Sequence, residues 1–210
     1  MPTLEKLIDG FKVYKATTYE QHRDLIMHQI EAGVQPTTMV VCSSEMQIAP
    51  ASLISCTPGE LYTIRLKAGL VAPFAKDKVS AFAGSLEYAV CEVGVQNIVV
   101  LGHSHNHGVR MVLEGGHKTS PSQALQDWLS VADEVAEAVK SQMGEYPFED
   151  QLRAMELETV VMGMRNLFSY PWIRSRVEEG KLEIYGWHFD VESGQLLAYA
   201  PNEGQFVPVE

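Results

Sequence analysis

Short apolar runs alternate with longer stretches of helical periodicity along most of the chain. Three runs rich in Val, Ile and Leu predict buried strands at residues 38–42, 61–65 and 97–101. Residues 79–93 predict a helix that ends at Gly94. Continuous apolar strands separated by helices are typical of a parallel sheet covered on both faces. We therefore predict an α/β fold with a mostly parallel sheet flanked by helices.

Helical patterns dominate the next part of the chain. Ser120-Pro-Ser-Gln123 matches a capping box with proline at the first helical position. Apolar residues from Leu125 to Val139 then recur at helical spacing, which predicts one helix with a buried stripe. A second stripe covers residues 157–168 and stops before Pro171.

The last part of the chain returns to strand patterns. Residues 182–190 and 195–199 predict two strands around a Glu-Ser-Gly turn. No linker, repeat or change of composition interrupts the sequence, so we expect residues 1–210 to form a single domain.

Composition narrows the class of partner and the location. Hydrophobic residues make up 46% and charged residues 20% of the 210 residues, which is ordinary for a globular protein. The net charge of -11 argues against a nucleic-acid partner. We find no secretory signal and no apolar run long enough to cross a bilayer, so no membrane partner is expected.

Three widely spaced cysteines do not resemble a disulfide framework. A reducing cytoplasm is therefore the expected location. Cys56 and Cys91 lie among apolar neighbours, and we expect both to be small buried residues. Cys42 differs because it ends the first predicted strand.

The loops that leave the carboxyl ends of parallel strands are where α/β sheets bind ligands. One such loop begins with Cys42, and the other, residues 102–108, contains His103, His105 and His107. Imidazole and thiolate are good zinc ligands, so metal binding is one interpretation. Alternating histidines are also typical of a solvent-facing loop, and the spacing leaves both open.

The chain resembles the beta-class carbonic anhydrases from Leu7 to Tyr199. The order and spacing of several short stretches carry the resemblance. They are residues 36–42, 58–60, 84–90, 95–104, 166–171, 180–182 and 185–190. The resemblance implies a zinc enzyme that hydrates carbon dioxide to bicarbonate. It also implies a homodimer or a higher homo-oligomer, because that family builds its pocket across a dimer interface.

The family holds zinc with a cysteine, a histidine and a second cysteine. Cys42 and His103 match the first two, but the second cysteine falls on Asn106, whose neutral amide is a poor zinc ligand. His107 is one substitute, giving a set of Cys42, His103 and His107, with His105 and Asn106 as alternatives. The other alternative is a site that holds no zinc.

The family's first cysteine also opens a Cys-x-Asp-x-Arg motif. Without a gap, its aspartate and arginine fall on Ser44 and Met46. With one extra residue they fall on Glu45 and Gln47, so Glu45 is a candidate displaced catalytic carboxylate. We expect Ser44, Met46, Gln47 and Gly108 to line the substrate pocket.

Three hypotheses follow from these departures. The first is a zinc lyase with altered ligation that hydrates carbon dioxide, or hydrolyses a related electrophile such as carbonyl sulfide or carbon disulfide. The second is a catalytically inactive homologue, a pseudoenzyme that binds an anion, a gas or a partner protein. The third is a structural subunit that uses only the dimer interface. The sequence leaves all three open, because a fold alone does not fix a function.

Overall fold

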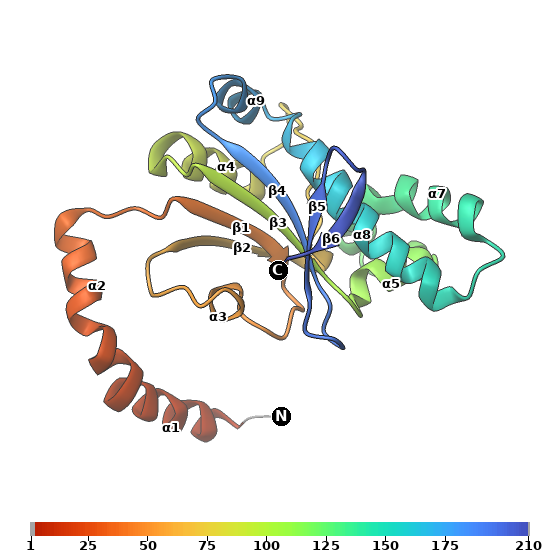
Figure 1. The fold of residues 1–210 in the computed structure, drawn as a ribbon. Helices are drawn as coiled ribbons and strands as arrows, with labels where there is room; N and C mark the ends of the chain where they lie inside the picture. Colours follow the sequence, from red (N-terminus) through yellow and green to blue (C-terminus); the bar gives the residue numbers. More distant parts are fainter. Residues whose placement is uncertain (1–2, 210) are drawn as a thin grey trace.

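A computed structural model describes residues 3–209, which form a six-stranded sheet in the order β2-β1-β3-β4-β5-β6 (Figure 1). The strands are β1 (Thr38–Ser43), β2 (Leu61–Leu66), β3 (Asn97–His103), β4 (Glu183–Phe189), β5 (Leu196–Ala200) and β6 (Gln205–Pro208). Strands β1 to β4 are parallel, and β5 and β6 are antiparallel additions. The predicted α/β fold with a mostly parallel sheet is confirmed.

Helices connect the strands and cover the sheet (Figure 1). The α-helices are α1 (Leu4–Tyr14), α2 (Glu20–Ala32), α3 (Pro50–Leu53), α4 (Ala81–Glu87), α5 (His107–Leu113), α6 (Gln123–Leu129), α7 (Asp133–Met143), α8 (Phe148–Leu167) and α9 (Pro171–Glu178). Two π-helical segments are η1 (Lys15–Tyr19) and η3 (Tyr88–Val93). The 3-10 turns are η2 (Lys67–Gly69), η4 (Gly116–Thr119) and η5 (Ser130–Ala132).

The two faces of the sheet have different surroundings. Met39, Val41 and Val100 lie on the face whose core includes residues of α4, α8 and α9. Cys42 and Leu101 lie on the other face, in a smaller apolar cluster completed by residues such as Val40, Val99 and Phe189. Because side chains alternate along a strand, this arrangement fixes the face on which each residue at the strand ends emerges.

The N-terminal helices form an arm. Figure 1 shows α1 and α2 extending away from the sheet, and neither helix contains a buried residue. Leu4, Leu7, Ile8 and Phe11 lie at helical spacing on α1, with exposures of 72%, 58%, 48% and 61%. Such a stripe normally faces a core, so this one lacks a partner within the described chain.

Two predicted helical features differ from the structure. The cap of α6 is Ser122, whose hydroxyl accepts from the Leu125 amide, so the helix begins two residues later than the predicted capping box at Ser120. The single helix predicted from Leu125 to Val139 is divided by η5 into α6 and α7. Apolar spacing is similar in 3-10 and α-helical turns, and therefore the pattern alone did not locate the break.

The prediction that Cys56 and Cys91 are buried is wrong. Cys91 is exposed, because its neighbours Ala89 and Val90 face the core instead, and Cys56 is only partly buried. Strand β6 was not predicted, since a four-residue edge strand carries too short a pattern.

Within residues 3–209, none of the helices combines the length and apolarity needed to cross a membrane.

Candidate functional site

Strands β1 and β3 end side by side and bring the predicted ligands to one edge of the sheet. Cys42 is paired with Leu101 in the parallel register, and His103 lies two residues further along β3 on the same face. A cavity of about 340 Å³ opens there. It is lined by Glu45, Met46, Gln47, Ile48, His103, Ser104, His105, His107, Phe189 and Val191.

His103 presents an unused imidazole nitrogen. The residue is only 5% exposed, and its Nδ1 donates to the carbonyl oxygen of Ser104 at 2.8 Å. Because a carbonyl oxygen can only accept, this bond places the proton on Nδ1 and leaves a lone pair on Nε2. Within the described chain, Nε2 is buried and has no hydrogen-bond partner. The Nε2 of His103 is therefore available to accept a hydrogen bond or to bind a metal.

Cys42 is fully buried, at 0% exposure. Burial raises the pKa of the Cys42 thiol, and the Arg65 guanidinium only partly offsets this rise. Without a metal the sulfur is accordingly a neutral thiol at physiological pH.

Asn106, at the position of the family's second cysteine, is occupied as a helix cap. It is 2% exposed, and its Oδ1 accepts from the amides of Gly108 at 3.1 Å and Val109 at 3.2 Å. Its Nδ2 donates to the carbonyl of Ala68 at 3.1 Å. Both polar atoms of the side chain are thus engaged in fixing α5 and η2.

The other two loop histidines are exposed and line the same cavity. His105 has a left-handed backbone, at φ 58°, is exposed, and its Nε2 lies 2.8 Å from Glu192 Oε1. His107 is exposed at the start of α5. Gly108 directly after it approaches Ala68 so closely that an added Cβ would lie 2.6 Å from the Ala68 Cβ. The start of α5 is therefore held tightly against η2.

A carboxylate and a cation form an ion pair beside the cavity. Glu45 Oε1 forms an ion pair with Lys67 Nζ, and Glu45 Oε2 accepts from the Gly108 amide at 3.3 Å. Both side chains are about 30% exposed, at 30% for Glu45 and 28% for Lys67. The sequence pointed to Glu45 but not to Lys67, which lies beyond the end of the neighbouring strand β2. The signal was available, because parallel strands that pair in register end at the same edge.

The loop after β1 is held by Arg65. Its Nε donates to the Ser43 carbonyl at 3.2 Å, and its Nη2 donates to the Met46 carbonyl. Of the four residues expected to line the pocket, Met46 and Gln47 line the cavity. Ser44 is exposed and Gly108 is buried against η2, so neither is among the cavity's lining residues.

A buried carboxylate supports the loop from below. Glu156 on α8 is 3% exposed, and its Oε1 accepts from the backbone N–H of Asn106 at 2.9 Å. Its other oxygen lies 3.8 Å from Nε2 of His188, which is 0% exposed. Arg153 contacts the His188 ring at 3.1 Å and pairs with Asp190 at 3.1 Å. Sequence reasoning missed this network, because its members lie far apart in the chain.

The donor set fits the family's zinc only in part. The Nε2 lone pair of His103 and the thiol of Cys42 suit the metal. The side-chain carboxamide of Asn106, however, is already hydrogen-bonded as the cap of α5 and to the Ala68 carbonyl. Among residues 3–209, no group of three or more His, Cys, Asp or Glu side chains converges as a metal site. The residues present therefore do not complete the family's ligand set.

Comparisons with known proteins agree with the fold and the order of these motifs. The carbonic anhydrase family model matches residues 38–196. A carbonic anhydrase of Synechococcus elongatus is 32% identical over 194 residues, which cover 92% of this chain and 71% of that protein. Beta carbonic anhydrase 3 of Arabidopsis thaliana is 29% identical over 196 residues, covering 92% of this chain and 76% of that protein.

Solved structures give the same result. The beta-carbonic anhydrase CcaA has a TM-score of 0.90 and 25% identity, and the match covers 99% of this chain and 92% of that chain. A tetrameric beta-carbonic anhydrase of Sordaria macrospora shares the fold, with a TM-score of 0.76 and 22% identity, over 92% of this chain and 95% of that chain. The chain therefore belongs to the carbonic anhydrase family, in its beta class.

Proposed function

We propose that this chain is a beta-carbonic anhydrase homologue that has given up zinc-dependent hydration and keeps its pocket as a binding site for a small anion. Bicarbonate is the first anion to test, because the family acts on carbon dioxide and bicarbonate. The observation that carries the proposal is the engagement of both polar side-chain atoms of Asn106 in three hydrogen bonds.

Asn106 would have to abandon its cap in order to bind a metal. Both amides that reach its Oδ1 come from the first turn of α5, and losing such a cap costs about 1 kcal/mol. The buried bond from Nδ2 to Ala68 adds about 1 kcal/mol more. An amide oxygen binds zinc much more weakly than a thiolate does. The balance therefore favours Asn106 as a structural residue.

The pocket's charge supports an anionic ligand. Three imidazoles, from His103, His105 and His107, line the cavity. The carboxylate that also lines it, Glu45, is paired with Lys67. A neutralised carboxylate repels an anion less than a free one. The His107 imidazole can donate a hydrogen bond to an oxyanion, and the Nε2 lone pair of His103 can accept one from the hydroxyl group of bicarbonate.

A second candidate function is the zinc lyase with altered ligation. It is favoured by the free Nε2 of His103 on the same face as the buried Cys42 thiol. His107 would have to supply the third ligand by a rearrangement of the start of α5. Carbon dioxide, carbonyl sulfide and carbon disulfide are the substrates to test for this function.

The N-terminal arm supports a homodimer. Its apolar stripe on α1 is exposed in the single chain, and we expect another apolar surface to pack against it. We propose that a second copy of the chain supplies this surface. Because the Sordaria macrospora relatives are described as tetrameric, a higher oligomer is the alternative.

We also propose that residues 1–210 act as one domain. The cytoplasm remains the proposed location, since Cys42, Cys56 and Cys91 are free thiols.

Two measurements on the untagged protein test the proposed function. Titration with ¹³C-bicarbonate, followed by NMR line broadening, should show saturable binding that His103→Ala weakens and His28→Ala leaves unchanged. Stopped-flow carbon dioxide hydration should stay at the buffer rate, even after incubation with zinc. Hydration well above the buffer rate that disappears in His103→Ala would instead support the zinc lyase.

A further inference from the structure

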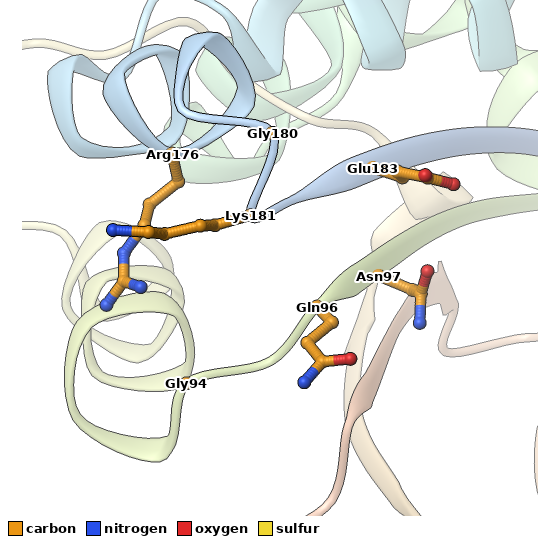
Figure 2. A pocket seen from close by; sticks show the side chains of 7 residues that line it. All are labelled: Gly94, Gln96, Asn97, Arg176, Gly180, Lys181 and Glu183. Carbon is orange, nitrogen blue, oxygen red and sulfur yellow. The ribbon is translucent and has the colours of Figure 1, made fainter.

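A second hollow lies at the opposite end of the sheet from His103. It has a volume of about 490 Å³ and sits at the amino ends of β3 and β4 (Figure 2). It is lined by Gly94, Gln96, Asn97, Arg176, Gly180, Lys181 and Glu183. Strand β3 spans seven residues, so this hollow is about 20 Å from the pocket at His103. Neither the family's chemistry nor the proposed function uses it.

Two glycines with left-handed backbones line the hollow. Gly94 ends η3 at φ 77° and Gly180 follows α9 at φ 67°, both in the left-handed region that favours glycine. No atom lies within 4 Å of where a Cβ would stand at either position. Both turns therefore rely on the conformational freedom of glycine, and neither adds a side chain to the lining.

Arg176 provides a cation without a partner. In residues 3–209, no carboxylate lies within 4 Å of its guanidinium, and its side chain makes no hydrogen bond. Lys181 lines the same hollow and shares one of its three donors with Glu179, at 2.8 Å. In Figure 2 the Arg176 side chain runs downward from α9, and the Lys181 side chain runs to the left across it. The hollow thus holds one free guanidinium and a partly free ammonium.

The nearby carboxylates leave these cations available. Glu179 is shared between Lys181 and the Ser175 hydroxyl, the latter at 3.0 Å. Glu183 accepts from the Tyr185 hydroxyl, and in Figure 2 its carboxylate points away from Arg176. Because the whole chain carries a net charge of -11, an anion can collect only where positive charge is local.

Carboxamides complete the lining. The Gln96 side chain makes no hydrogen bond within the described residues, whereas the Nδ2 of Asn97 donates to the Thr38 hydroxyl at 3.4 Å. This arrangement leaves Gln96 and the oxygen of Asn97 free for the hydroxyl groups of a ligand.

We propose that this hollow binds a small phosphate-type oxyanion, either free phosphate or the phosphate group of a hydroxylated metabolite. The planar guanidinium of Arg176 can hold two oxygens of such an anion, and the Lys181 ammonium adds a point charge. Gln96 recognises a hydroxyl group beside the anion when the ligand is an ester. The site is independent of the pocket at His103, so bicarbonate binding can fail while phosphate binding succeeds.

Isothermal titration with inorganic phosphate and with glycerol 3-phosphate, at constant ionic strength in chloride, tests the site. We expect saturable binding that Arg176→Gln and Lys181→Gln each weaken about tenfold, since one charge-assisted hydrogen bond contributes at least that factor. Arg174→Gln is the matched control, because Arg174 lies on the same helix α9 but donates to the Phe168 carbonyl. Its affinity should equal that of the wild type.

Comparison of the two probes distinguishes the sources of the phosphate group. Equal affinities support free phosphate as the ligand, and tighter binding of glycerol 3-phosphate, lost in Gln96→Ala, supports an ester. Absence of saturable binding by either probe overturns the proposal. So does binding that Arg176→Gln and Arg174→Gln change equally, since that outcome reflects net charge alone. Circular dichroism of each variant checks that these surface changes preserve the fold.

Discussion

Replacement of Asn106 by alanine tests whether its side chain is structural. The substitution removes the cap of α5 and the bond to the Ala68 carbonyl, at about 1 kcal/mol each. The Gly108 amide keeps Glu45 as an acceptor, so the amide left without a partner is that of Val109. We therefore expect the free energy of unfolding to fall by about 2 kcal/mol.

Urea unfolding at fixed protein concentration measures this loss. With a denaturant slope of about 2 kcal/mol per molar, the midpoint should move down by about 1 M. Ser80→Ala is the control, because Ser80 caps α4 through a single bond to Ala83 at 3.2 Å and is exposed. It should cost about 1 kcal/mol or less. If Asn106→Ala costs no more than Ser80→Ala, Asn106 is not held as described and its oxygen is available to a ligand.

Three further predictions concern the surroundings of the site. Burial, with Arg153, holds the pKa of His188 below its ordinary value of 6.5. Below about pH 6.5 the His188 imidazole binds a proton in the unfolded chain but not in the folded chain. The free energy of unfolding should therefore fall as the pH drops below that value. Urea midpoints between pH 8 and pH 5 should show this slope, reduced in His188→Gln but not in His28→Gln. Lys67→Met leaves the Glu45 charge uncompensated and should weaken bicarbonate binding several-fold in the NMR titration, whereas unchanged affinity would mean that the ion pair does not affect the pocket. Phe11→Asp places a charge in the apolar stripe of α1 and should convert the dimer to monomer in light scattering; a dimer that persists would place the interface elsewhere.

The fold could be predicted because its strands carry strong local patterns. Residues 38–42 and 97–101 are apolar at nearly every position, and both became central strands. Local patterns also located Cys42 and His103 at one edge of the sheet. They failed at Ser120, where two serines two residues apart are equally good caps and the structure uses the second, Ser122.

The candidate site was harder to predict, because its decisive contacts join distant segments. The ion pair of Glu45 with Lys67 joins residues 22 positions apart, and the bond of Glu156 to the Asn106 amide joins residues 50 positions apart. The spacing of apolar residues along the chain carries no information about such contacts between distant segments. The capping role of Asn106 was visible in principle, since asparagine is a preferred residue before a helix. Because Asn106 also falls on a ligand position of the family's motif, the same residue carries two sequence signals, and the structure uses it as the cap.

Zinc content is the measurement that bears most directly on the proposal that the metal site has been lost. The untagged protein and Asn106→Cys should be expressed side by side with zinc in the medium, dialysed, and measured by mass spectrometry of the metal. We expect the wild type to retain well under one zinc per chain, and Asn106→Cys, which restores a thiolate beside Cys42 and His103, to approach about one. About one zinc per wild-type chain, lost in His103→Ala, would contradict the proposal and establish an altered metal site.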